Sequence, residues 1–182
     1  MTPEKLRSRA GRKLSLVLRH QPEAIGLKLD RQGWADVNHL LDRLAKAKLP
    51  IDRADLDRIV AENNKQRFSF NDDGTKIRAN QGHSIDVDLG FVPIEPPATL
   101  FHGTAARFVD SILATGLEAR SRQHVHLSAD RETAVAVGKR HGRPVILLVD
   151  AGRMHKAGYE FYRSENGVWL ARAVPAEYLN RP

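Results

Sequence analysis

The residues that could do chemistry include three cations on one face of a predicted β-hairpin, Arg67, Lys76 and Arg78. Alternating stretches on either side of Asp73-Gly74 indicate the hairpin, and side chains alternate between the two faces of a strand. Like charges on facing strands repel by up to about 1 kcal/mol per pair, so a bound anion would offset this cost. A solvated face, partly neutralised by Asp72 and Asp73, explains the pattern equally well. The opposite face is apolar and carries Phe68, Phe70 and Ile77.

The pair Arg19-His20 follows a predicted amphipathic helix. Thr2 and Pro3 are typical of an N-cap and a first helical position, and Pro22 marks where the helix must have ended. A cation near a helix C-terminus complements the helix dipole, which is the commoner role of a single arginine. The adjacent histidine titrates near neutral pH, so the pair could also hold an anion or move a proton.

A third group lies in the stretch 120–128, which contains Arg122, His124 and His126. If residues 124–127 form a strand, both histidine side chains point to the same face. Two histidines on one face could bind a metal ion. No third ligand stands at a suitable spacing, so we expect no metal site here.

The stretch Phe101-His102-Gly103-Thr104 ends a predicted strand and precedes a predicted helix. Glycine at that place would let a ligand approach the backbone, and a helix start offers N–H groups to an anion. A structural histidine at a strand end is the simpler explanation of His102. The sequence has no GxGxxG fingerprint after a strand, no Walker A motif and no nucleophile elbow, which leaves those nucleotide-binding and hydrolase classes unsupported.

Two sets of elements must position these groups. In residues 1–90 we predict three helices, beginning at Pro3, near Val37 and after Asp52, and then the hairpin, an order typical of a winged helix. Residues 91–98 carry three of the nine prolines and predict a linker. Strands and helices alternate in 99–182. The strands are predicted at 99–102, 124–127, 145–150, 159–163 and 168–172, and the helices at 105–114 and 130–140, the second capped by Ser128.

Composition excludes several classes of protein. The 182 residues contain no cysteine, which excludes disulfide scaffolds, thiol catalysis and cysteine-bound metal. No apolar run approaches the ~20 residues of a membrane span, and the first residues are too charged for a secretory signal. We therefore expect a cytoplasmic protein without membrane contact.

The charge balance predicts a polyanionic partner. The net charge is +7, with 17 basic against 13 acidic residues in 1–90 and 12 against 9 in 91–182. Both halves are basic, and a basic protein without a membrane signature most often binds nucleic acid.

Taken in order, the segments resemble the RNA 2′-phosphotransferase (KptA-like) family over nearly the whole chain. The most specific combination is 77–84, Ile-Arg-Ala-Asn-Gln-Gly-His-Ser, with 124–128, His-Val-His-Leu-Ser. The other matching stretches are Leu18-Arg19-His20 with Pro22, Gly33-Trp34, Lys65-Gln66-Arg67-Phe68, Leu100 to Thr104, Gly116-Leu117, Arg122-Gln123, and Gly167 to Leu170 before Val174-Pro175.

The resemblance implies an α+β fold. A winged-helix-like RNA-binding lobe would span 1–90, and an ADP-ribosyltransferase-like mixed α/β lobe that binds NAD would span 99–182. The family's catalytic set carries over to Arg19, His20, Arg67 and Arg122. Its NAD motif carries over to His102, Gly103 and Thr104, and less directly to His126 and Ser128. For RNA contacts we expect Lys65, Lys76 and Arg78.

The implied substrate is RNA with an internal 2′-phosphate, as tRNA splicing leaves at a junction. The phosphate would attack the nicotinamide ribose of NAD and displace nicotinamide. The ribose 2″-hydroxyl would then attack phosphorus, releasing 2′-OH RNA and ADP-ribose 1″,2″-cyclic phosphate. NAD is a co-substrate in this scheme, no metal is needed, and we expect a monomer.

Two alternatives stay open at this point. The first is an ADP-ribosyltransferase that modifies a nucleic-acid terminal phosphate or a protein, which would share the pocket and differ in the acceptor. The second is a non-catalytic winged-helix regulator that binds nucleic acid through Arg19-His20 and the hairpin cations. Release of nicotinamide would separate a catalyst from a binding protein.

Overall fold

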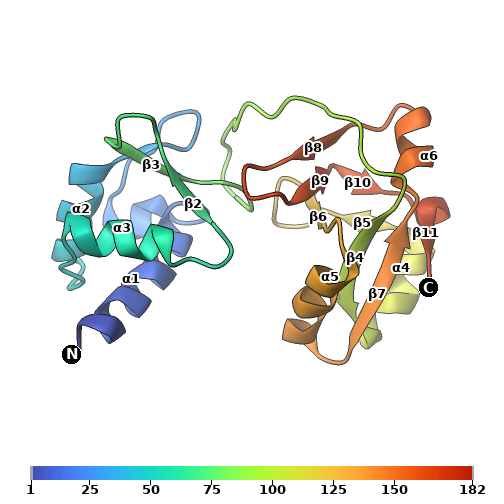
Figure 1. The fold of residues 1–182 in the computed structure, drawn as a ribbon, viewed down its shortest axis with the longest axis horizontal. Helices are drawn as coiled ribbons and strands as arrows, with labels where there is room; N and C mark the ends of the chain where they lie inside the picture. Colours follow the sequence, from blue (N-terminus) through green and yellow to red (C-terminus); the bar gives the residue numbers. More distant parts are fainter. Residues whose placement is uncertain (1, 182) are drawn as a thin grey trace. The chain divides into compact units, whose positions relative to one another are not determined.

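The computed structural model describes residues 2–181, which divide into two compact units with the boundary in the chain between Gly90 and Phe91. Each unit has a hydrophobic core of its own. The architecture is mixed α+β, as expected, with short antiparallel sheets and helices in both units (Figure 1).

The first unit begins with the three predicted helices. They are α1 (Pro3–Val17), α2 (Val37–Lys46) and α3 (Arg53–Ala61), with a 3-10 turn, η1 (Pro22–Ile25), after α1. The expected caps are present: the Thr2 side chain accepts from the backbone N–H of Lys5, and that of Asp52 from Asp55. These helices bury Leu14, Leu40 and Leu56 completely.

The predicted hairpin forms the sheet of the first unit. Strands β2 (Phe68–Phe70) and β3 (Lys76–Ala79) pair antiparallel, and β1 (Ala35–Asp36) adds to the other edge of β3. Phe70 lies opposite Ile77 and Ser69 opposite Arg78. This register confirms that Phe68, Phe70 and Ile77 share one face and that Lys76 and Arg78 lie on the other, whereas Arg67 precedes β2 and lies outside the paired strands.

The second unit contains two three-stranded antiparallel sheets. One has the order β11–β7–β4, with β4 Leu100–Ala105, β7 Pro144–Val149 and β11 Leu179–Asn180. The other has the order β6–β9–β8, with β6 Val125–Leu127, β8 Phe161–Arg163 and β9 Trp169–Ala171. A two-stranded pair joins β5 (Leu117–Glu118) to β10 (Ala173–Val174). A bridge between Phe101 and Ser128 brings β4 beside the end of β6.

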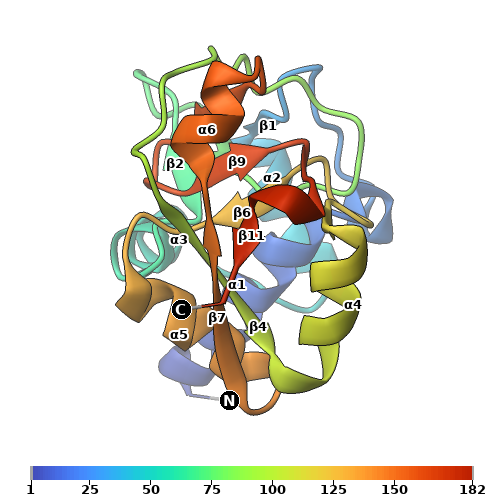
Figure 2. The same ribbon diagram turned by 90° about the vertical axis from the view of Figure 1, so that its right-hand side faces the viewer.

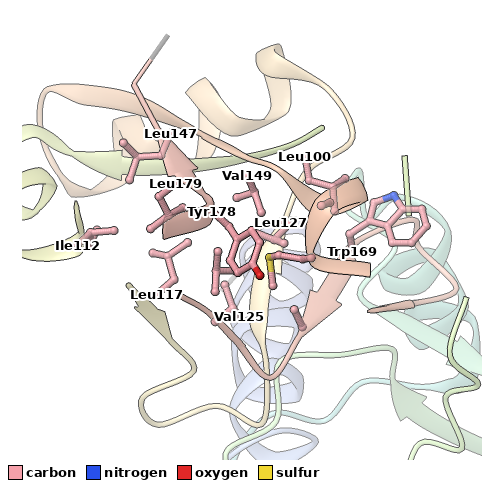
Figure 3. Packing of buried hydrophobic residues seen from close by; sticks show 14 of the residues in the cluster. Leu100, Ile112, Leu117, Val125, Leu127, Leu147, Val149, Trp169, Tyr178 and Leu179 are labelled. Carbon is pink, nitrogen blue, oxygen red and sulfur yellow. The ribbon is translucent and has the colours of Figure 1, made fainter. Parts of the chain in front are cut away.

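Helices cover both faces of the β4–β7 pair. Figure 2 places α5 (Arg131–Gly138) on one side of the pair and α4 (Val109–Thr115) on the other. A further helix, α6 (Ala151–Lys156), follows β7. Leu127, Val149 and Tyr178 meet in the core, as Figure 3 shows, and Trp169 lies at its edge.

Two expectations for the second unit are wrong. Ser128 does not cap the second helix; Asp130 does, because its carboxylate accepts from the backbone N–H of Thr133 at 2.7 Å. The backbone of Ser128 is instead hydrogen-bonded to Phe101 in both directions, at 2.8 and 2.9 Å. The predicted helix at 105–114 also begins late, as a 3-10 turn, η2 (Ala106–Phe108), before α4.

His102-Gly103-Thr104 lies inside β4 and not at its end. Gly103 faces α5, where a Cβ atom would overlap the Ala134 carbonyl oxygen and crowd the Gly138 backbone nitrogen. Gly103 therefore lets a helix pack against the strand, and the expectation that a ligand approaches the backbone there is wrong. The neighbouring His102 and Thr104 point to the opposite face, because side chains alternate along a strand.

The proline-rich stretch 91–98 has no regular secondary structure and lies against the second unit. Ile94 donates its N–H to the Phe161 carbonyl at 2.8 Å, and the Ala98 carbonyl accepts from Gly152 at 3.0 Å. The Phe91 ring stacks near Tyr162 with ring centroids 6.3 Å apart. These contacts make residues 91–98 part of the second unit.

Candidate functional site

Residues 80–84 of the first unit connect two of its predicted site elements. The Asn80 N–H donates to the Arg67 carbonyl at 2.9 Å, and its side-chain amide donates to the Gln66 carbonyl at 2.7 Å. Four residues later the Ser84 N–H donates to the Arg19 carbonyl at 3.0 Å. The segment 80–84 therefore holds the backbones of Arg19 and Arg67 in a fixed relation.

The imidazole of His20 is oriented by Ser84, the last residue of the matching stretch 77–84, to which the sequence assigned no role. Its Nδ1 lies 2.9 Å from the Ser84 hydroxyl. The helical turn of α1 continues to this point, because the His20 N–H donates to the Leu16 carbonyl at 2.9 Å. Ser84 is thus tied to both members of the Arg19-His20 pair, to one by its backbone and to the other by its side chain.

Arg67 lies just before β2 and is half-buried. Its guanidinium donates to the Asn63 side-chain oxygen at 3.2 Å, which fixes one edge of the fork. The backbone at Gln66 has a φ of +42°, a conformation uncommon outside glycine, and the Asn80 amide bonds to the carbonyl of that residue. Asn63 and Asn80 are therefore the residues that set the position of Arg67.

The other hairpin cations have separate partners. Lys76 forms an ion pair with Asp30, with 3.3 Å between nitrogen and oxygen. The Arg78 guanidinium lies over the Trp34 ring, 4.4 Å from its centroid. Lys65 is exposed in the turn before Arg67. The sheet thus places Lys76 and Arg78 on the predicted face, but does not gather them around one empty anion site with Arg67.

His83 is almost completely buried near Arg19 and Arg78, with 1% of its surface exposed. Burial is the largest cause that lowers its pKa, and together with the positive charges of Arg19, His20 and Arg78 it brings the pKa to about 4, although the Leu18 backbone raises it. A neutral imidazole therefore packs beneath Arg19-His20 at neutral pH, against the backbone of Gly33.

The depressed pKa of His83 predicts acid sensitivity of the first unit. The unfolded chain takes up a proton near 6.5 and the folded chain only near 4, so the stability is complete above 6.5 and is lost as pH falls toward 4. The loss amounts to about 3 kcal/mol. Urea unfolding at several pH values, followed by Trp34 fluorescence in a Trp169→Phe background, measures it. His83→Gln should remove most of this pH dependence, and an equal slope in both proteins would contradict the assignment.

Hydrogen bonds connect three of the predicted site residues of the second unit, Arg122, His126 and His102. The Arg122 guanidinium donates to Nδ1 of His126 at 3.0 Å, which requires that nitrogen to be unprotonated. The backbone carbonyl of His126 lies 3.2 Å from Nδ1 of His102. A carbonyl only accepts, so His102 carries its proton on Nδ1 and leaves Nε2 as an acceptor. Burial lowers the pKa of His102 more than this bond raises it, which keeps the ring neutral at pH 7.

Ser128 and Thr104 lie in the elements beside this chain. Ser128 is half-buried at the bridge to Phe101, and Thr104 is buried on the face of β4 that carries His102. His124 lies apart from His126, because its ring packs against Phe91 and Tyr162 in an aromatic cluster. The two histidines thus have different roles, and His124 acts as packing.

The amino-acid sequence was also compared with those of known proteins. The model of the RNA 2′-phosphotransferase, Tpt1 / KptA family fits residues 5–173. The chain belongs to this family. It is 59% identical to a probable RNA 2′-phosphotransferase of Agrobacterium fabrum over 91% of this chain and 89% of that protein. It is 55% identical to proteins of the same name from Nostoc punctiforme and Hahella chejuensis, over 92% and 97% of this chain and 93% and 95% of theirs.

In this member of the Tpt1/KptA family, hydrogen bonds connect Arg19, His20 and Arg67 within the first unit, and Arg122, His126 and His102 within the second. Within residues 2–181 no group of three or more histidine or acidic side chains is arranged to hold a metal ion. No helix in the same range has the length and apolar character needed to cross a bilayer.

Proposed function

We propose that the chain removes an internal 2′-phosphate from RNA in an NAD-dependent reaction that yields 2′-OH RNA, nicotinamide and ADP-ribose 1″,2″-cyclic phosphate. The observation that carries the proposal is the hydrogen-bonded segment 80–84, which ties Arg19, His20 and Arg67 together in a chain that belongs to the RNA 2′-phosphotransferase family. In this reading the first unit is a winged-helix-like RNA lobe and the second an ADP-ribosyltransferase-like NAD lobe.

The first unit supplies the phosphate-binding groups. Guanidinium forks bind two phosphate oxygens at once, and Arg67 already has one edge fixed by Asn63. A phosphate monoester is mostly dianionic at neutral pH, since its second pKa is about 6, so the attacking phosphate needs no base to activate it. Arg19 and Arg67 position this group, and His20 holds a phosphate oxygen or handles a proton. Lys65, Lys76 and Arg78 are RNA contacts of secondary weight, since Lys76 and Arg78 are engaged elsewhere in the fold.

The second unit supplies groups suited to NAD. The neutral ring of His102 offers Nε2 as an acceptor, which matches a ribose hydroxyl. Arg122, oriented by His126, presents a fork to a phosphate oxygen. Thr104 lies on the same face of β4 as His102, Ser128 lies at the bridge to Phe101, and Gly103 contributes by allowing α5 to pack against β4.

The two chemical steps place different demands on these residues. In the first step the 2′-phosphate attacks the anomeric carbon of the nicotinamide ribose, and the bond to nicotinamide breaks. In the second the ribose 2″-hydroxyl attacks phosphorus, and the bond to the RNA 2′-oxygen breaks. Charge accumulates on the phosphoryl oxygens in this second step, where fixed cations favour the transition state most. Arg19, Arg67 and Arg122 are therefore assigned to both steps, with their largest effect on the second.

The decisive experiment is incubation of the protein with NAD and a short RNA that bears one internal 2′-phosphate. Mass spectrometry should find 2′-OH RNA, nicotinamide and a cyclic phosphate of ADP-ribose. A stable ADP-ribosylated acceptor without the cyclic phosphate would replace the proposal with an ADP-ribosyltransferase. RNA binding without nicotinamide release would replace it with a regulator. We also propose that the enzyme is cytoplasmic and that it is a monomer. Sedimentation of the purified chain tests the oligomeric state.

Replacement of Ser84 by alanine should lower kcat by about tenfold, because the His20 ring then loses the partner at Nδ1. Ser84→Thr, which retains a hydroxyl, should recover most of the activity. The readout that separates positioning from simple folding is the pH profile of kcat, whose limb belonging to His20 should shift in Ser84→Ala and return in Ser84→Thr. Parental kcat and pH profile in Ser84→Ala would show that this hydrogen bond plays no part.

A further inference from the structure

Helix α1 carries five basic residues that the proposed reaction does not use, and four of them belong to one surface. These four are Lys5, Arg9, Arg12 and Lys13, which we call the basic stripe. The first three are exposed and Lys13 is half-buried. Residues three or four apart lie on the same face of a helix, so these side chains form one cationic surface on the first unit.

The basic stripe lines two adjoining open hollows. One, of about 460 Å³, is lined by Lys5, Ser8, Arg9 and Arg12. The other, of about 350 Å³, is lined by Arg9, Arg12 and Lys13 with the apolar side chains of Leu16, Ala47 and Leu49. The Arg12 guanidinium donates to the Ser8 hydroxyl at 3.0 Å, which holds it along the helix surface. A cationic rim beside apolar side chains fits a chain of phosphates linked by sugars that carry bases.

The position of these charges is unfavourable for the helix itself. Lys5, Arg9 and Lys13 follow one another at intervals of four residues, and like charges at that spacing repel by a few tenths of a kcal/mol per pair. Lys5 also lies in the first turn, where the helix dipole disfavours a cation. Arg7 lies outside the stripe and forms an ion pair with Asp55 of α3 at 3.2 Å. A bound polyanion would offset the cost that the stripe imposes.

The stripe leads along the helix toward the proposed phosphate site. The helical turn continues to His20 through the hydrogen bond from its N–H to the Leu16 carbonyl. At 1.5 Å per residue, Arg12 precedes Arg19 by roughly 10 Å along the axis. A single RNA strand whose 2′-phosphate lies at Arg19-His20 could therefore place flanking phosphodiesters on the stripe.

From these observations we propose that the basic stripe binds the RNA backbone outside the modified nucleotide, as a sequence-independent phosphate contact. The inference rests on the proposed function for its choice of RNA strand. It adds that RNA length, and not only the 2′-phosphate, determines affinity. Each neutralised phosphate releases counterions, so the contact must also appear in the dependence of binding on salt.

The test compares two triple variants on two RNAs. Arg9→Gln/Arg12→Gln/Lys13→Gln removes most of the stripe, and Lys28→Gln/Arg31→Gln/Arg58→Gln removes three exposed cations elsewhere on the first unit. Circular dichroism checks that both are folded. Turnover is measured with a 2′-phosphorylated trinucleotide and with a strand of about 20 nucleotides carrying the same group. Binding of the unmodified longer strand is measured by fluorescence anisotropy at several salt concentrations.

We expect the stripe variant to raise KM for the longer RNA by about tenfold or more, with kcat unchanged, and to reduce the slope of log affinity against log salt by about 2. Its kcat/KM for the trinucleotide should stay within about twofold of the parental value. An unchanged affinity for the longer strand, or an equal loss in the control variant, would overturn the proposal. Since anisotropy needs no turnover, absence of activity in the parental protein would count against the proposed function and leave the stripe to be judged by binding.

Discussion

Arg122→Ala should lower the rate of 2′-phosphate removal by about a thousandfold, the scale on which single cations act on phosphoryl transfer. The fold should be retained, because Arg122 is exposed and its described hydrogen bond is to the side chain of His126. The rate of Arg122→Lys should lie between those of the parental protein and Arg122→Ala, since lysine keeps the charge but lacks the planar guanidinium. Single-turnover assays with 2′-phosphorylated RNA and NAD measure the effect.

Arg120→Ala is the matched control for Arg122→Ala. Arg120 is an exposed arginine two residues earlier in the same loop, and the proposed site does not use it. The variant Arg120→Ala should therefore retain nearly the parental rate of 2′-phosphate removal. Equal losses in the two variants would mean that the loop contributes only general positive charge. A parental rate in Arg122→Ala would remove Arg122 from the proposed site.

Gly103→Ala should be the most damaging substitution for stability, although it adds only one methyl group. The added Cβ would overlap the Ala134 carbonyl oxygen, and a backbone atom cannot move aside as a flexible side chain can. To relieve the overlap, α5 must separate from β4, which exposes the face that supports His102. We expect a loss of about 3 kcal/mol or more in the free energy of unfolding of the second unit. Weaker NAD binding should accompany this loss.

The two tryptophans make the Gly103→Ala measurement specific to one unit. Trp169 belongs to the core of the second unit, so its fluorescence in a Trp34→Phe background reports unfolding there. Gly11→Ala in the first unit is the control, followed by Trp34 fluorescence in a Trp169→Phe background, because its Cβ would meet Ile59 at an ordinary 3.6 Å in the middle of α1. That variant should be neutral or gain up to about 1 kcal/mol. A stable Gly103→Ala protein with parental NAD affinity would contradict the packing role.

Local signals predicted much of the fold. The N-caps at Thr2 and Asp52 and the sorting of hairpin faces around Asp73-Gly74 all appear as expected. Such features depend on residues only a few positions apart. The strands β1, β5, β10 and β11 escaped prediction because each has two residues, too few to establish an alternating pattern.

The errors and omissions have a different origin, since each depends on a partner far away in the chain. Gly103 appeared to be a ligand-approach residue because α5, which occupies the space beside it, begins almost thirty residues later. Ser84 was not singled out because its partner His20 is 64 positions away. Ser128 was taken as a cap because the sequence does not reveal its backbone pairing with Phe101. Residue types indicated the chemistry. Only the tertiary contacts show that Ser84 is hydrogen-bonded to His20, whereas Lys76 is paired with Asp30.

The hydrogen bonds of segment 80–84 make two backbone amides useful as reporters. The Asn80 N–H is protected only while it reaches Arg67, and the Ser84 N–H only while it reaches Arg19. Deuterium uptake at these two amides would therefore record how often the contact with Arg67 and the contact with Arg19 open, each separately and without any substrate. Slower uptake at both amides on addition of inorganic phosphate would indicate that a bound anion stabilises both hydrogen bonds together.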